Sequence, residues 1–227
     1  MQEIPTIRSI ERLGPDPLPQ PAYLRALARF FSYVFHPLFI AVYVSAYLIY
    51  VHPYSFAVLG EKQKLLRLIS LFVITVFFPA VTVFLLWRLQ FANSIFLRTQ
   101  KERIIPYVAS IIYFFWAFFV TRNLPGTPVI MSFFFLGSFL SVSAALMANN
   151  YFKISMHSLA VGGAMMYMIL LGLFSGEPMG IPIAAATIIT GIVCTSRFIV
   201  SDHYPFEIYW GLVVGAASQV VAYYFIM

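Results

Sequence analysis

The feature that most constrains this chain is a series of apolar stretches, each long enough to cross a lipid bilayer as a helix. The hydrocarbon core of a bilayer is about 30 Å thick, and a helix needs about 20 apolar residues to span it. Only 10% of the residues are charged, against about 25% in soluble domains. Candidate spans cover about residues 30–51, 65–89, 104–120, 129–147, 181–196 and 205–226, and a further span follows residues 149–158 and ends near Phe174. We therefore expect an all-α polytopic membrane helix bundle with six or seven transmembrane helices.

The first 25 residues differ in composition from the rest of the chain. They are polar, and five prolines fall within residues 5–21. No apolar core follows a basic start, so this stretch does not have the pattern of a secretory signal peptide. We expect residues 1–25 to form a polar N-terminal tail and residues 26–227 to form the transmembrane domain.

The composition also limits the partners and cofactors. The single cysteine, Cys194, rules out an intramolecular disulfide and a cysteine-cluster metal site. The net charge is +6, and in a membrane protein such an excess reports orientation and contact with lipid headgroups. The sequence shows no nucleic-acid-binding signature. We expect membrane lipids as partners, and no nucleic acid, metal or cofactor; the oligomeric state stays open.

Residues 194–207 place an arginine, a histidine and a glutamate between two long apolar stretches. An arginine at the bilayer centre costs about 2.5–3.5 kcal/mol on insertion scales, so charges beside a span usually serve a function. Pro205 suits the first position of a helix and makes Tyr204 its cap. Glu207 then lies in the first helical turn, where it can bond one ring nitrogen of His203 and leave the other nitrogen for attack, as in activated nucleophiles.

Arg197 ends the sixth expected span. Its planar guanidinium group matches two oxygens of a phosphate group. The alternative interpretation is an ion pair between Arg197 and Asp202, with Glu207 as an acidic residue that favours a helix start.

Two further polar stretches carry basic residues. Residues 98–106 form a basic loop, and residues 153–158 begin a helix that Ser155 is expected to cap, with His157 in its first turn. A helix start attracts anions because its backbone N–H groups and its dipole face outward. Arg197, Lys153 and Ser155 are therefore candidate phosphate-binding residues.

Seven spans would place these three stretches and the tail on one membrane face. His36 is the exception, because it lies inside the first expected span, where Pro37 predicts a kink. Pro79 predicts a second kink in the next span. Gly211 and Gly215, four residues apart, indicate a close approach between two helices.

The spacing Ser-Arg-x5-His-x3-Glu over residues 196–207, with the two glycines after it, resembles the third signature of the type 2 phosphatidic acid phosphatase family. Residues 153–157 resemble that family's second signature, usually Pro-Ser-Gly-His, with Ile154 and Met156 in place of the proline and glycine. Glu207 stands where the family usually has an aspartate. The family's first signature, a lysine followed after six residues by Arg-Pro, has no match in spacing. Arg103 is the best candidate for its arginine, and Arg98 or Lys101 for its lysine, so the resemblance implies that these residues bind phosphate as well.

The resemblance implies a role for each matched residue. His203 would be the nucleophile that forms a phosphohistidine intermediate, and Glu207 would orient it. His157 would protonate the leaving alkoxide, and Arg197 would bind the phosphate. The chain would then be an integral membrane lipid-phosphate phosphatase that needs no metal, acting on a phosphoric monoester or a diphosphate.

Two other functions stay open. The chain could be a catalytically inactive relative that binds or translocates a phospholipid headgroup, or a subunit of a membrane complex. A weaker alternative is an ion or proton pathway that uses His36, His157 and His203.

The charge distribution predicts the orientation. Ten of the Lys and Arg residues fall on the face of the tail and four on the other face. The positive-inside rule then places the N-terminus and the polar stretches in the cytoplasm. The resemblance implies a bacterial inner (plasma) membrane, where members of the family generally face the periplasm, so the two arguments disagree about the side.

Overall fold

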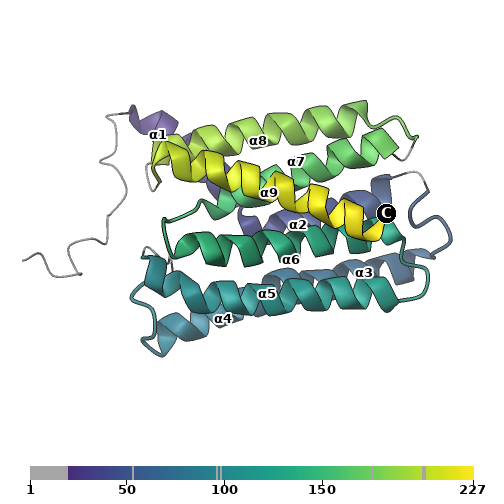
Figure 1. Ribbon diagram of the computed structural model, residues 1–227, viewed down its shortest axis with the longest axis horizontal. Helices are drawn as coiled ribbons and strands as arrows, with labels where there is room; N and C mark the ends of the chain where they lie inside the picture. Colours follow the sequence, from purple (N-terminus) through teal and green to yellow (C-terminus); the bar gives the residue numbers. More distant parts are fainter. Residues whose placement is uncertain (1–19, 53, 96, 98, 175, 201–202) are drawn as a thin grey trace, which may run out of the picture.

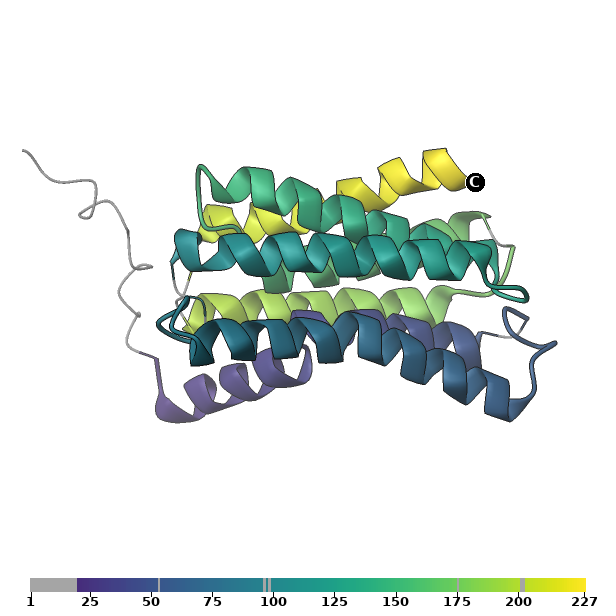
Figure 2. The same ribbon diagram turned by 90° about the horizontal axis from the view of Figure 1, so that it is seen from below.

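The computed structural model describes residues 20–52, 54–95, 97, 99–174, 176–200 and 203–227. Helices lie side by side along one axis and are joined by short turns (Figures 1 and 2). The α-helices are α1 (Ala22–Val34), α2 (Pro37–Ala46), α3 (Glu61–Phe72), α4 (Phe78–Arg88), α5 (Gln100–Asn123), α6 (Val129–Asn149), α7 (Met156–Phe174), α8 (Gly180–Val200) and α9 (Pro205–Ile226), with π-helical segments η2 (Tyr47–Val51) and η3 (Val73–Phe77).

The expected fold class is confirmed. Within the described part of the chain, six helices are long and apolar enough to cross a membrane, and a bent pair of helices would make a seventh span. The protein is therefore an integral membrane protein with a polytopic helical bundle. The six helices are Glu61–Arg88, Gln100–Asn123, Val129–Asn149, Met156–Phe174, Gly180–Val200 and Pro205–Ile226, and the bent pair is Ala22–Val34 with Pro37–Val51.

The first span is broken rather than only kinked. Helix α1 ends at Val34, α2 begins at Pro37, and their axes differ by 57°. His36 adopts an extended backbone conformation (φ −63°, ψ 141°) as the N-cap of α2. Proline disfavours helical backbone in the residue before it and lacks an N–H group of its own. Helix α1 begins at Ala22, before the expected start of the first span near residue 30.

The second span bends for a related reason. Pro79 lies in the first turn of α4, directly after the π-helical segment η3. A wider turn accommodates the missing N–H group and the bulk of the proline ring, so the span continues as Glu61–Arg88.

Helices α7 and α9 pack closely because both carry glycines at their contact. A Cβ atom added to Gly211 would lie 2.7 Å from the Ser155 carbonyl oxygen, and one added to Gly215 would lie 2.1 Å from the Leu159 carbonyl oxygen. On the facing helix, a Cβ atom on Gly162 would lie 2.6 Å from the Leu212 carbonyl oxygen. The expected close approach is present, and it brings the starts of α7 and α9 together.

Candidate functional site

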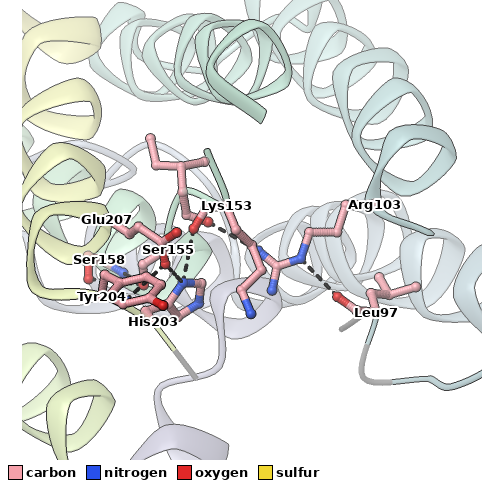
Figure 3. A network of polar contacts seen from close by, with 9 residues as sticks. Leu97, Arg103, Lys153, Ser155, Ser158, His203, Tyr204 and Glu207 are labelled. Carbon is pink, nitrogen blue, oxygen red and sulfur yellow. Dashed lines mark hydrogen bonds and ion pairs between the residues drawn. The ribbon is translucent and has the colours of Figure 1, made fainter. Parts of the chain in front are cut away.

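The candidate residues gather at one end of the bundle, where the turns from α4 to α5, α6 to α7 and α8 to α9 lie (Figure 1). Figure 3 shows that side chains from the starts of α5, α7 and α9 meet there. Arg103 (9% exposed), Arg197 (7%) and His203 (3%) are all buried. Because charged groups are costly to bury in a membrane bundle, this end is the candidate functional site.

His203 and Glu207 form the expected contact. The Nδ1 atom of His203 lies 3.0 Å from the Glu207 carboxylate oxygen Oε2 and 3.0 Å from the Lys153 carbonyl oxygen. Both partners are acceptors, so Nδ1 carries the proton of the neutral ring and Nε2 keeps its lone pair. The Tyr204 N–H group donates to the same Glu207 oxygen at 3.0 Å, as expected for a glutamate in the first turn of α9.

The surroundings of His203 keep its ring neutral. Burial is the largest of the effects that together lower the pKa of His203 from 6.5 to about 4. The Glu207 hydrogen bond raises the pKa, and the positive charges of Arg103, Arg197 and Lys153 lower it further. His203 is therefore an uncharged imidazole at neutral pH, with a defined tautomer.

Arg103 joins two of the polar stretches. Its Nε atom donates to the Leu97 carbonyl oxygen at 2.9 Å, and its Nη1 atom donates to the Ile154 carbonyl oxygen at 3.1 Å. These bonds direct the guanidinium group toward residues 153–157 (Figure 3). Arg103 also interacts electrostatically with Arg197 and Glu207. Arg103, for which the sequence offers no matching spacing, thus belongs to the buried polar cluster at this end of the bundle.

Ser155 caps α7, as the sequence predicts, and it is fully buried. Its hydroxyl oxygen accepts from the Ser158 N–H group at 3.4 Å and from the Ser158 hydroxyl at 3.1 Å. The Ser155 N–H group donates to the Glu207 carbonyl oxygen at 3.2 Å. Ser155 therefore ties α7 to α9, and its hydroxyl is engaged in capping rather than turned toward a ligand.

His157 lies in the first turn of α7, as expected. Its Nε2 atom lies 3.2 Å from the Ser32 carbonyl oxygen. A carbonyl oxygen only accepts hydrogen bonds, so Nε2 of His157 carries a proton. Nδ1 is then the ring nitrogen that can exchange a proton with another group. The neighbouring Met156 side chain packs between helices inside the bundle, against a cluster that includes Tyr107 and Leu159.

His36 is a residue of this end that the sequence did not place there. The prediction that His36 lies apart from the polar stretches is wrong, because its ring centroid lies 5.3 Å from that of His157 in an edge-to-face arrangement. The His36 Nδ1 atom accepts from the Leu38 N–H group at 3.4 Å. The break at Pro37, which the sequence does signal, is what carries His36 to this position.

The remaining predicted site residues differ in their position relative to the buried cluster. Lys101 is exposed in the first turn of α5, and the described residues show no contact between it and the buried cluster. Lys153 lies beside His203 and acts on it through its charge and its carbonyl oxygen. Arg98 and Asp202 lie outside the described residues, so the alternative ion pair between Arg197 and Asp202 lies outside them too.

The three histidines gather at the same end of the bundle. His157 interacts electrostatically with both His36 and His203, and no row of histidines extends along the described part of the bundle. Within the same part of the chain, no group of three His, Cys, Asp or Glu residues could hold a metal ion.

Comparisons with protein-family models, with curated proteins and with solved structures find no match to this chain.

Proposed function

We propose that the protein is an integral membrane phosphohydrolase that removes a phosphoryl group from a lipid phosphate or diphosphate through a phosphohistidine intermediate. The observation that carries this proposal is the pair of acceptors on His203 Nδ1, the Glu207 carboxylate and the Lys153 carbonyl, each at 3.0 Å. They fix the tautomer in which Nε2 is a nucleophile. A site that only bound an anion would need cations but no oriented, uncharged imidazole.

The positive field around His203 suits a phosphoryl group. Arg103, Arg197 and Lys153 all act electrostatically on the His203 ring. The N-terminal ends of α2, α7 and α9 lie at the same end of the bundle, and broken helices in membranes commonly direct such ends at anionic groups. Charge that is fixed in position before the reaction stabilises the transition state of phosphoryl transfer.

The reaction proceeds in two displacements. The Nε2 lone pair of His203 attacks phosphorus, the bond between phosphorus and the leaving oxygen breaks, and His157, which must carry a second proton on Nδ1 for this step, gives that proton to the leaving oxygen. Water then attacks the phosphohistidine and gives a proton to His157, the N–P bond breaks, and inorganic phosphate leaves. Glu207 and the Lys153 carbonyl stabilise the positive charge that develops on the His203 ring in the first step.

The test is phosphate release from lipid phosphates by the purified protein, compared with single variants. His203→Ala should abolish release above background, and Arg197→Ala should lower kcat/KM by about 10²–10³-fold, the effect of removing one preorganised donor. Glu207→Gln should cost about 10²-fold, less than the roughly 10⁴-fold that follows loss of tautomer control in a catalytic triad, because the Lys153 carbonyl still holds Nδ1–H.

Arg122→Ala is a matched control, because Arg122 is exposed in the last turn of α5 at the opposite end of the bundle. It should retain the wild-type rate. Wild-type rates in His203→Ala or Arg197→Ala would contradict the mechanism. Saturable binding of lipid phosphates without any release of phosphate would favour the non-catalytic relative instead.

We also propose a membrane and an orientation for the protein. The Lys and Arg distribution favours an N-terminus in the cytoplasm, and the family resemblance favours a bacterial inner membrane.

A further inference from the structure

An apolar groove of about 220 Å³ runs between α2, α7 and α8. Helix α2 contributes Ile40 and Tyr43, α7 contributes Val161 and Met168, and α8 contributes Ala185. Tyr43 is 44% exposed and Ala185 is also exposed, so the groove opens sideways between α2 and α8. In the membrane this opening faces the bilayer.

The groove lies on the helix faces that also carry the polar residues. Val161 follows His157 by four residues on α7, and a rise of about 1.5 Å per residue separates them by about 6 Å along the helix. Thr190 precedes Arg197 by seven residues on α8, which is about 10 Å. Residues three, four or seven apart share a helix face, so the walls of the groove lead toward His157 and Arg197.

The third wall of the groove also leads to the site, through the break between α1 and α2. Phe35, directly before His36, lines the same groove. All three walls therefore pass from apolar residues to a histidine or an arginine at the site. A molecule that matches this arrangement has an anionic head and a hydrocarbon chain.

The length of the groove also fits one leaflet. On α8 its lining extends from Pro182 to Thr190, a rise of about 12 Å. Half of the hydrocarbon core is about 15 Å thick. Because α8 begins at Gly180, at the end of the bundle opposite the site, the groove covers the half of α8 that is farther from Arg197. A chain whose head lies at the site must therefore span about 10 Å before it reaches the groove, so only a long chain fills it.

A second cavity between α2, α5, α6, α7 and α9 is less suited to a hydrocarbon chain. Its volume is about 70 Å³, and Ser110, Ser138, Ser141 and Gln219 are among its lining residues. The Gln219 Oε1 atom is buried without a hydrogen-bond partner, and an apolar occupant would leave this acceptor unsatisfied.

We propose that the groove between α2, α7 and α8 binds the hydrocarbon chain of the lipid whose phosphate group occupies the site at His203, an assignment that rests on the proposed function. The groove selects for substrates that carry a long chain. Burial of each CH₂ group along the chain is favourable, and the walls direct the head to the cations. The competing explanation is that ordinary bilayer lipids fill the groove. Their binding there would not depend on a phosphate head at His203.

The experiment compares kcat/KM for a long-chain alkyl phosphate and for butyl phosphate in Ala185→Phe and Ala184→Phe. Ala185 lines the groove, and its neighbour Ala184 is equally exposed but lies outside the lining. Ala185→Phe should lower kcat/KM at least about 10-fold for the long chain, as expected for losing contacts of a few CH₂ groups, and by less than about 2-fold for butyl phosphate. Ala184→Phe should change neither value.

Equal effects of Ala185→Phe on both substrates, or no effect on the long chain, would overturn the groove assignment. Such a result would leave the proposed phosphatase intact, because turnover of butyl phosphate is measured in the same experiment.

A second readout does not depend on turnover. A long-chain alkyl phosphate with a photoreactive group in its chain should crosslink to peptides that contain residues 161–168 or 182–190. The corresponding alkyl phosphate should compete, and the corresponding alcohol should not. Labelling that is spread over all helices, or that the alcohol competes equally well, identifies bilayer lipid and overturns the inference. Specific labelling without any phosphate release would reject the phosphatase and keep the groove.

Discussion

Single residues define the chemistry of the site through the direction of their hydrogen bonds. The two acceptors on His203 Nδ1 determine which ring nitrogen is protonated. The Ser32 carbonyl does the same for His157, with the opposite nitrogen. One imidazole thus presents the Nε2 lone pair and the other presents Nδ1 as its site of proton exchange, an arrangement that suits the nucleophile and the proton donor of the proposed reaction.

At this scale we predict that the His203 ring stays neutral at pH values well below the usual pKa of histidine. Burial, with a smaller contribution from nearby cations, lowers its pKa to about 4. A group with a lowered pKa takes up its proton only as the pH falls through the lower value, so the ring should remain neutral, with Nδ1 protonated, between about pH 5 and 8. NMR titration of ¹⁵N-labelled histidine rings, assigned with His203→Gln, measures both the pKa and the tautomer.

A matched variant tests the cause of the low pKa. Lys153→Met removes one of the cations that lower it and keeps the backbone carbonyl that binds Nδ1, so the titration should move to higher pH. Titration of wild-type His203 near its ordinary pKa of 6.5, or a ring protonated at Nε2, would contradict the geometry of the site.

At the scale of helices, the contact between α7 and α9 positions the polar groups of the candidate site. The glycines at this contact leave no room for a side chain. The close approach lets the Ser155 N–H group reach the Glu207 carbonyl oxygen. The same approach brings the Lys153 carbonyl oxygen to His203. Two stretches about 50 residues apart in sequence are therefore held together by backbone contacts.

We predict that Gly215→Ala separates α7 from α9. Its Cβ atom would lie 2.1 Å from the Leu159 carbonyl oxygen and 2.9 Å from the Gly163 backbone nitrogen. Overpacking of this kind costs about 1–3 kcal/mol, so the thermal unfolding midpoint in detergent should fall and phosphate release should decrease. Gly191→Ala is the control, because a Cβ atom there meets nothing within 4 Å. Equal midpoints for the two variants would show that the contact does not limit stability.

At the scale of the whole molecule, the arrangement of spans places the site and the C-terminus at opposite ends of the bundle. Helix α9 begins at the site and ends near the C-terminus (Figure 1). Helices α6 and α7 meet at the site end, and α5 and α6 meet at the other end (Figure 2). The two ends of the bundle must therefore lie on opposite sides of the membrane.

We predict that reporters fused after Met227 and inserted at Asn150 report opposite sides. Asn150 lies in the turn between α6 and α7, at the site end. With the tail in the cytoplasm, as the positive-inside rule favours, an alkaline phosphatase fusion after Met227 should be active and one at Asn150 inactive. The reverse pattern would place the site on the outer face and overturn the proposed orientation. The same side for both fusions would contradict the arrangement of spans.

The sequence by itself determined the features that depend on neighbouring residues along one helix. Apolar length predicted the spans, Pro205 and Ser155 predicted helix starts, and a spacing of four residues predicted the contact between His203 and Glu207. These features follow from helical periodicity and from backbone groups that need a cap, and both are local.

Only the tertiary structure decided which helix faces meet. It brought His36 against His157, directed Arg103 to the Ile154 carbonyl oxygen and left Lys101 exposed. It also formed the groove between α2, α7 and α8. The physical reason is that the tilt and rotation of each helix follow from packing against its neighbours, set here by the glycine contact and the break at Pro37, and no spacing along one chain segment specifies them.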